Sequence, residues 1–254
     1  MTETPKILLH RAGMPENTLK AIRSALEYKE VDGFEIDIRP CKDTIVVFHD
    51  KDLSRATRGK IRENLKNLDY SSLKKINVFG KEYVPSLYEV VLSLKNSLKR
   101  KGLFVKLDIK EYDEKMKRDL SQMIDSVNGN VRFIIDIDHE MGDMHRLELY
   151  RYWKGKRNSH VLLEVPGRMN RSILESSDII GYTFHEGNVY SSIPIYIRKR
   201  KMVDVYIANV SKGTLKRILM HLKKYNPNFI TPNYMMNVLL VKNLIKMLYN
   251  CCGC

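Results

Sequence analysis

Short apolar, β-branched segments alternate with longer amphipathic segments along the whole chain, and this alternation limits the fold more than any other feature. The segments expected to form strands are Lys6–His10, Gly33–Arg39, Leu103–Ile109, Val131–Ile137, His160–Val165, Ile179–Phe184, Val203–Ala208 and Phe229–Thr231. Between them apolar residues recur at helical spacing, as in Leu215, Ile218, Leu219 and Leu222. About eight strand–helix units predict an α/β protein of the (β/α)₈ TIM-barrel type. A doubly wound open sheet is the alternative, but no glycine-rich nucleotide loop follows the first strand.

The length of the chain favours one domain with a single insertion. Its 254 residues match the roughly 250 residues of a typical barrel, so we expect a single domain over 1–254. A second extended piece, Thr44–His49, follows the second strand, and residues from Asp50 to about Tyr83 are rich in Lys, Asn and Ser. We interpret about 50–83 as a small insertion after the second strand that forms a lid over one side of the barrel mouth.

The net charge of +14 is concentrated near the C-terminus. Residues 198–254 contain eleven Lys or Arg and one acid, Asp204. Such a surface attracts anions, which include phosphoesters, acidic lipid headgroups and nucleic acid. A lysine-rich surface without any function is an equally good interpretation. Aromatic residues do not interleave with the basic ones, and no zinc-finger or RNA-recognition pattern occurs, so nucleic acid is disfavoured.

The termini and the cysteines bear on location. The first ten residues contain no apolar leader, and no stretch approaches the roughly 18 apolar residues that span a bilayer. Cys41 stands alone, and three more cysteines lie in the tail at 250–254, which is no disulfide framework. We therefore expect a cytoplasmic monomer, with peripheral contact to an anionic membrane as an option. The tail is either palmitoylated beside the basic surface or left unmodified.

Polar residues gather at the C-terminal ends of the expected strands, where a (β/α)₈ barrel builds its active site. Glu35 and Asp37 are two positions apart on one strand, so their side chains share a face, as do Asp108 and Lys110 on the next. Acids, histidines and a lysine meeting at one barrel mouth are costly to bury without a purpose. The residues concerned are His10, Glu35, Asp37, His49, Asp108 and Lys110.

Five segments in order resemble the signatures of one enzyme family. They are HRAGMPENT (His10–Thr18), FEIDI (Phe34–Ile38), VVFHD (Val46–Asp50), VPSLYEV (Val84–Val90) and KLDIK (Lys106–Lys110). Their order and spacing are similar to those of the glycerophosphodiester phosphodiesterases across roughly the first 110 residues. Each motif alone is weak, but five in order are a strong signal.

The resemblance implies a metal site. Glu35, Asp37 and Asp108 would hold a divalent cation, and a hard ion such as Mg²⁺ or Ca²⁺ prefers oxygen ligands. The metal would polarise the phosphodiester and neutralise charge that develops on its oxygens.

The resemblance also implies roles for the remaining polar residues. His10 and His49 would be an acid–base pair, since the ordinary histidine pKa of about 6.5 suits both roles. Arg11 and Lys110 would bind the non-bridging oxygens of a small-molecule phosphodiester. Glu16 would shape the loop beside the metal, or it would be a helix N-terminal carboxylate that faces the dipole.

Three departures from the family pattern affect the substrate. The chain reads His10-Arg11-Ala12 where the family usually has HRG, and Gly13 would supply the permissive backbone one residue later. Asp108 replaces the usual Glu, which resembles the sphingomyelinase D type phospholipases. The seventh strand has Tyr206 where the family carries a Trp-bearing segment.

We therefore expect metal-dependent hydrolysis of glycerophosphodiesters to glycerol phosphate and an alcohol. Alternatives are lysophospholipase D or sphingomyelinase D-like activity on membrane lipids, and a non-catalytic phosphate-binding module. Glu164, and His185 with Glu186, are further candidates for the mouth. The other histidines, His139 among them, are expected to be solvated or structural.

Overall fold

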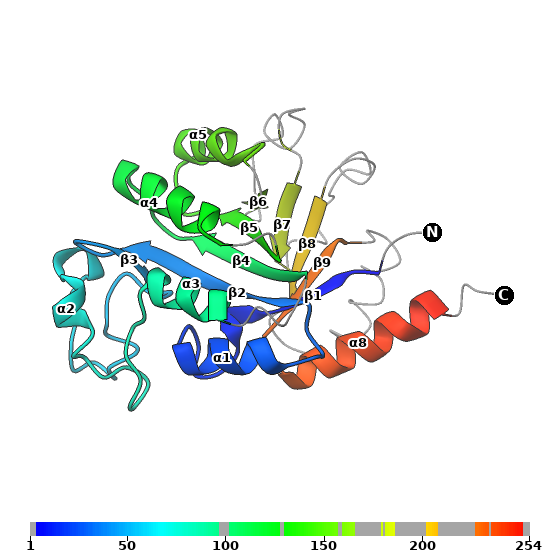
Figure 1. The fold of residues 1–254 in the computed structure, drawn as a ribbon, viewed down its shortest axis with the longest axis horizontal. Coiled ribbons are helices and arrows are strands. Elements are labelled where there is room, and N and C mark those ends of the chain that lie inside the picture. The colour runs from blue at the N-terminus through cyan, green and yellow to red at the C-terminus, as the bar shows by residue number, and fades with distance from the viewer. Residues whose placement is uncertain are drawn as a thin grey trace.

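The computed structural model describes residues 4–96, 102–127, 130–156, 159–165, 179, 181–185, 202–207, 227–233 and 235–250, and every structural statement below refers to these residues. Its centre is a ring of eight parallel strands: β1 (Lys6–Leu9), β2 (Gly33–Pro40), β4 (Leu103–Ile109), β5 (Val131–Ile137), β6 (Ser159–Val165), β7 (Gly181–His185), β8 (Met202–Ile207) and β9 (Phe229–Pro232). They pair in chain order from β2 to β9, and β1 pairs with both β9 and β2, so the sheet curls back on itself (Figure 1). The predicted barrel fold is confirmed.

A short antiparallel strand lies outside this ring. β3 (Ile45–Val47) pairs with the last three residues of β2. The extended piece expected at Thr44–His49 is therefore shorter, and His49 lies two residues beyond the strand. His10 likewise does not close β1, because the chain leaves the strand at Leu9 and enters the 3₁₀ turn η1 (His10–Ala12).

In the part of the chain that the structure describes, helices follow five strands of the ring: β1, β2, β4, β5 and β9. They are α1 (Leu19–Glu27), α3 (Leu87–Asn96), α4 (Glu114–Asp125), α5 (Asp143–Trp153) and α8 (Met235–Asn250), with the shorter η2 (Leu65–Asn67) and α2 (Tyr70–Leu73) between β3 and α3. α1 begins at an N-cap threonine, because the Thr18 hydroxyl accepts a hydrogen bond from the backbone N–H of Ala21. The helix expected around 215–222 lies outside the described residues.

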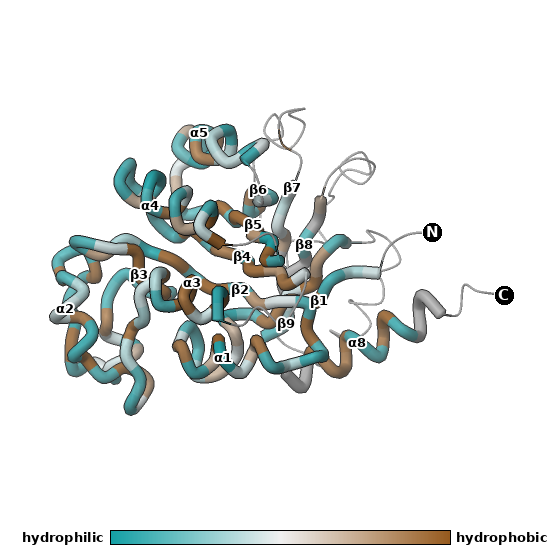
Figure 2. The backbone as a smooth tube through the Cα atoms, in the orientation of Figure 1, coloured by the Kyte–Doolittle hydropathy of each residue, from teal (hydrophilic) through white to brown (hydrophobic). Residues whose placement is uncertain are grey.

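The period-two alternation of the strands separates the core from the site. In β4, Leu107 and Ile109 belong to the main hydrophobic core, which the helices cover, whereas Lys106 and Asp108 line the barrel cavity. Figure 2 shows hydrophobic residues along β2 and β4 and a mostly hydrophilic α4.

The lower part of the barrel interior is apolar. Buried side chains from five strands form a separate cluster: Leu8, Phe104, Ile134, Leu162 and Phe229. Gly33 allows the strands to approach closely there, since a Cβ atom at this position would lie 1.9 Å from the carbonyl oxygen of Phe104. This apolar layer lies below the polar residues, which line a pocket toward the C-terminal end of the strands.

Residues between β2 and α3 have a small core of their own. Its buried members are Cys41, Val46, Phe48, Leu53, Ala56, Leu65, Leu73, Val78 and Val84. In Figure 1 this part of the chain, which includes α2, lies at one end of the molecule beyond β3. Its core extends past both expected bounds, 50 and 83, and its function as a lid stays a prediction.

Among the described helices, none combines the length and the apolar character needed to cross a membrane.

Candidate active site

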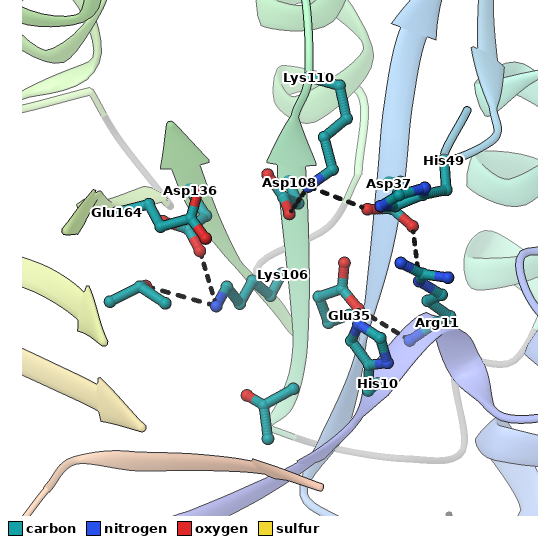
Figure 3. A pocket seen from close by; sticks show the side chains of 12 residues that line it. His10, Arg11, Glu35, Asp37, His49, Lys106, Asp108, Lys110, Asp136 and Glu164 are labelled. Carbon is teal, nitrogen blue, oxygen red and sulfur yellow. Dashed lines mark hydrogen bonds and ion pairs between the residues drawn. The ribbon is translucent and has the colours of Figure 1, made fainter. Parts of the chain in front are cut away.

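All seven residues predicted for the site line one cavity at the C-terminal end of the barrel strands. They are His10, Arg11, Glu35, Asp37, His49, Asp108 and Lys110. The close-up in Figure 3 shows them converging from β2, β4, η1 and the segment after β3. Tertiary structure therefore brings together side chains that lie up to 100 positions apart in the sequence.

Three carboxylates in this cavity form a group that could hold a metal ion. Glu35 and Asp37 point inward from β2, and Asp108 on β4 is the direct register partner of Asp37. Each residue offers one oxygen, and the three oxygens lie within 4.8 Å of one another. Glu35 and Asp37 are each only 1% exposed, so little water is available to solvate their charges.

Two of these carboxylates keep an oxygen without a partner. Glu35 Oε2 accepts the backbone N–H of Arg11 at 2.7 Å, but Oε1 has no hydrogen-bond partner among the described residues, and neither does Asp108 Oδ1. Burial, with the neighbouring Asp37 charge, raises the pKa of Glu35 to about 8, and burial also raises the pKa of Asp108 well above its usual range. Buried carboxylate oxygens that lack compensation fit a hard divalent cation.

Asp37, by contrast, is surrounded by donors and cations. Its Oδ2 accepts the Asn17 side-chain amide at 2.7 Å and lies 3.2 Å from Arg11 Nε, and its Oδ1 lies 3.5 Å from Lys110 Nζ. Burial alone would raise the pKa of Asp37, but the Lys110 and Arg11 charges outweigh it and lower the pKa to about 2. Asp37 is therefore ionised at any working pH. Asn17 was not predicted as a site residue, although it belongs to the motif HRAGMPENT (His10–Thr18).

Lys110 lies among acids rather than apart from them. Its Nζ is 2.7 Å from Asp108 Oδ2 and 2.6 Å from Asp138 Oδ2. Burial opposes its charge, but Asp108 and Asp37 raise the Lys110 pKa further, so the ammonium is permanently charged. The side chain thus places a fixed positive charge beside the three carboxylates.

His10 sits at the start of a strained turn. Its Nε2 lies 3.7 Å from Glu35 Oε2, and burial lowers the His10 pKa to about 3, which keeps the imidazole neutral. The turn needs left-handed backbone at Arg11 (φ 51°) and Ala12 (φ 56°) as well as at Gly13 (φ 96°). Permissive backbone was expected at Gly13 alone. Such strain persists where the surrounding structure holds a side chain in place.

His49 is held at both its backbone and its ring. Its carbonyl oxygen accepts Arg39 Nε at 2.7 Å, and Nδ1 lies 2.7 Å from Asp50 Oδ1. About a third of the side chain is exposed. The Asp50 contact fixes the ring orientation, which leaves Nε2 available to a bound molecule.

The Arg11 guanidinium is paired with two acids. Nη1 donates to Glu16 Oε2 at 2.8 Å, while Nε faces Asp37. Glu16 precedes the first residue of α1, Leu19, and no acid stands in the first turn of that helix. Glu16 therefore lies outside the first turn of α1, where a helix N-terminal carboxylate would stand, and its carboxylate contacts Arg11 instead.

A polar layer that was not predicted forms the floor of the cavity. Lys106 Nζ lies 2.7 Å from Asp136 Oδ2 and 2.5 Å from Asp204 Oδ2, and Thr183 and Thr231 complete the layer. Two features of the sequence could have indicated this layer. Lys106 precedes Asp108 by two positions, and Asp136 begins a D-x-D pair at the end of β5. Asp204 and Thr231 are isolated polar residues in apolar strands and gave no signal.

A second acidic group lies at the ends of β5 and β6. Asp138, His139 and Glu164 could also hold an ion by distance, but Glu164 is hydrogen-bonded to His139, and Asp138 to Lys110 and Glu140. Glu164 Oε2 lies 2.9 Å from the His139 backbone nitrogen and 2.7 Å from its Nδ1. Glu164 lines the cavity as expected, whereas the side chain of His185, all of Glu186 and the side chain of Tyr206 lie outside the described parts.

Comparisons with known proteins identify a family for this chain. The model of a family described as the glycerophosphoryl diester phosphodiesterase family matches residues 10–165. No curated protein matches the sequence.

Solved structures of low sequence identity share the fold. A Galdieria sulphuraria protein assigned as a glycerophosphodiester phosphodiesterase has a TM-score of 0.70 and 20% identity over 94% of this chain and 98% of its own. The glycerophosphodiester phosphodiesterase of Thermotoga maritima gives 0.67 and 18% over 97% and 100%. That of Agrobacterium tumefaciens gives 0.63 and 17% over 94% and 98%.

Proposed function

The chain belongs to the glycerophosphoryl diester phosphodiesterase family, and from this premise we propose that it hydrolyses glycerophosphodiesters with a divalent cation and two histidines. Family membership makes the protein a phosphodiesterase whose substrate is a small-molecule phosphodiester. The proposal concerns the finer points, which are the metal, the roles of the side chains and the choice between soluble and lipid substrates.

The unpartnered oxygens of Glu35 and Asp108 carry the argument for a cation. They are buried and they face the same cavity as Asp37. Glu35, Asp37 and Asp108 would hold Mg²⁺ or Ca²⁺ through oxygen ligands. When bound, the ion would polarise the phosphodiester and neutralise negative charge on its oxygens.

The two histidines supply acid–base catalysis in this proposal. Figure 3 shows His10 beside Glu35 and His49 beside Asp37, so the rings flank the two carboxylates of β2. One ring takes the proton of the attacking hydroxyl group, and the other donates a proton to the departing alcohol. The attacking hydroxyl is either water or a hydroxyl of the glycerol itself, in which case a cyclic phosphate forms first and is then hydrolysed.

Arg11 and Lys110 provide the positive charge that an anionic phosphate needs. Both lie next to Asp37, from opposite directions, and acids hold both in place. Their charges balance the carboxylates that would otherwise repel the substrate. We assign them to the non-bridging oxygens of the phosphodiester.

The described cavity lining supports a small, polar substrate. Every described residue that lines it carries a polar or charged side chain, so the described walls offer an acyl chain no apolar side chain to pack against. The lipid alternative depended on the basic segment 198–254, and nine of its eleven Lys and Arg residues lie outside the described residues. Soluble glycerophosphodiesters are therefore the substrates we propose.

The test is an assay of the purified protein on glycerophosphocholine. We expect glycerol phosphate and choline in equal amounts, loss of turnover in excess chelator, and recovery when Mg²⁺ or Ca²⁺ is added. Lysophosphatidylcholine serves as the matched lipid substrate. Full turnover in chelator would exclude the metal, and cleavage of the lipid alone would support the alternative substrate.

A further inference from the structure

Arg55 lies outside the cavity, in the segment between β3 and η2, and joins two carboxylates. Its Nε donates to Asp50 Oδ2 at 2.6 Å, and its Nη2 donates to Glu16 Oε1. Asp50 follows β3, whereas Glu16 belongs to the loop between η1 and α1. One guanidinium thus connects the segment that carries His49 to the loop that follows Arg11 and η1.

Each of these carboxylates uses its second oxygen to hold a residue of the candidate site. Asp50 Oδ1 lies 2.7 Å from His49 Nδ1. Glu16 Oε2 accepts Arg11 Nη1 at 2.8 Å. The result is an unbroken chain of charged contacts that runs from His49 through Asp50, Arg55 and Glu16 to Arg11.

The guanidinium group suits this position better than an ammonium would. Two of its nitrogens point to two acids, which a lysine, as a single point charge, reproduces poorly. Its central carbon lies 5.7 Å from the centre of the Phe79 ring, and that ring contacts Phe48, the residue before His49. The aromatic contact further restricts the position of the guanidinium.

These ion pairs are expected to contribute little to the stability of the fold. The Arg55 side chain is 48% exposed, and ion pairs at exposed sites contribute little to folding. The contacts hold His49 and Arg11 rather than the core, so the loss of Arg55 is expected to change activity more than stability. Burial by itself would raise the pKa of Asp50, but hydrogen bonds with His49 and Arg55 lower it to about 2, which keeps Asp50 ionised.

We propose that Arg55 is a positioning residue that orients His49, through Asp50, relative to Arg11, through Glu16. The proposal rests on the proposed function, because it gives His49 and Arg11 their chemical tasks. Arg55 itself does not touch the substrate. It sets the angle at which the histidine meets the phosphodiester bound beside Arg11.

The experiment compares Arg55→Ala, Arg55→Lys and Arg58→Ala with the wild type in the metal-loaded enzyme. Arg58 is the matched control, an exposed arginine in the same segment. For Arg55→Ala we expect kcat on glycerophosphocholine to fall about 10- to 100-fold, as for outer residues that orient site ligands. The Mg²⁺ affinity and the unfolding temperature should stay near the wild-type values. Arg55→Lys should recover part of kcat, and Arg58→Ala should lose none.

Two further measurements keep the test decisive. In the Asp50→Asn background, Arg55→Ala should add almost no further loss, because Arg55 acts on His49 through Asp50. The imidazole NMR signals of His49, assigned with His49→Ala, should shift in Arg55→Ala but not in Arg58→Ala.

Wild-type kcat and unchanged His49 signals in a folded Arg55→Ala protein would overturn the proposal. An inactive wild type would instead refute the proposed function, and the NMR comparison would still decide whether Arg55 orients His49.

Discussion

Two acidic groups lie on either side of Lys110, and they differ in how their charges are balanced. The β2–β4 group consists of Glu35, Asp37 and Asp108, and the β5–β6 group consists of Asp138, His139 and Glu164. By distance alone both could hold a cation. Figure 3 shows that Lys110 reaches from β4 toward Asp37 and Asp108, and its Nζ also lies 2.6 Å from Asp138.

In the β5–β6 group, both acids already accept hydrogen bonds from nearby nitrogens. Glu164 lies within hydrogen-bond distance of the His139 ring and backbone nitrogens, and Asp138 Oδ1 accepts the backbone N–H of Glu140 at 2.7 Å. In the β2–β4 group, Glu35 and Asp108 each keep a buried oxygen for which the described residues offer no partner. A buried carboxylate oxygen without a donor makes the anion less stable, and binding a proton or a cation relieves this cost.

Proximity of acids is therefore a poor guide to a metal site. The number of unsatisfied oxygens separates the two groups, whereas spacing does not. Variants that remove one charge from each group, with little change of shape, test this distinction directly.

The largest effect is expected for Glu35→Gln. The amide oxygen can still accept the Arg11 N–H, but the charge that a cation needs is gone, so we expect Mg²⁺ affinity to fall by at least about 100-fold and turnover to reach background. Isothermal titration with Mg²⁺ measures the affinity. Glu164→Gln is the matched variant in the other group and should bind Mg²⁺ like the wild type. Equal losses in both variants would refute the distinction between the groups.

The histidines come next. His10→Ala and His49→Ala should each reduce kcat by at least about 100-fold, the scale of lost general acid–base catalysis. Mg²⁺ affinity should change little, because neither ring belongs to the three carboxylates. Single-turnover kinetics at saturating Mg²⁺, with circular dichroism to verify folding, provide the measurement. Near-normal turnover in either folded variant would show that the reaction does not need two histidines.

Asp108 should give a graded result. Asp108→Asn removes one of three charges and should weaken Mg²⁺ binding by about tenfold or more, whereas Asp108→Glu restores the side-chain length usual in the family and should bind at least as well. Metal titrations monitored by activity compare the three proteins. If the Asn variant binds as tightly as the wild type, the third ligand is another acid, and Glu164 is the first to examine.

The smallest effect on catalysis is expected for Glu164→Gln. Its charge compensates His139 rather than a metal, so kcat should stay within a few-fold of the wild type. The loss of a charged acceptor for the His139 nitrogens should reduce the free energy of unfolding by about 1–3 kcal/mol. Urea unfolding at neutral pH measures this change. A large loss of kcat with unchanged stability would move Glu164 from a structural role to contact with the substrate.

Much of the fold could be predicted from the sequence because strands are local. The β4 and β5 bounds agree with the predicted segments Leu103–Ile109 and Val131–Ile137, since β-branched runs ended by polar residues are read without tertiary information. The predicted end of β1 is one residue too late. The cause is the turn at His10–Ala12, whose left-handed backbone at Arg11 and Ala12 no propensity rule predicts.

The composition of the site could also be predicted, but not its internal pairing. The period-two alternation of a strand is enough to place Glu35 and Asp37 on one face, and Asp108 with Lys110 on another. It does not reveal Lys106 with Asp204, a pair separated by 98 positions and 2.5 Å. That contact depends on how eight strands close into a ring, which a local pattern does not encode.

By itself the sequence determined the alternation of strands and helices, the order of the motifs and the polar residues at the strand ends. These follow from periods of two and 3.6 residues and from side-chain chemistry, both of which are local. Tertiary structure alone decided which acids are neutralised. The balance of charge at Glu35, Asp108 and Glu164 depends on donors from other strands and loops, and burial makes every missing donor costly. The same holds for Arg55. Its partner Asp50 is near in the sequence, but Glu16 is 39 positions away and reaches Arg55 only in the folded protein.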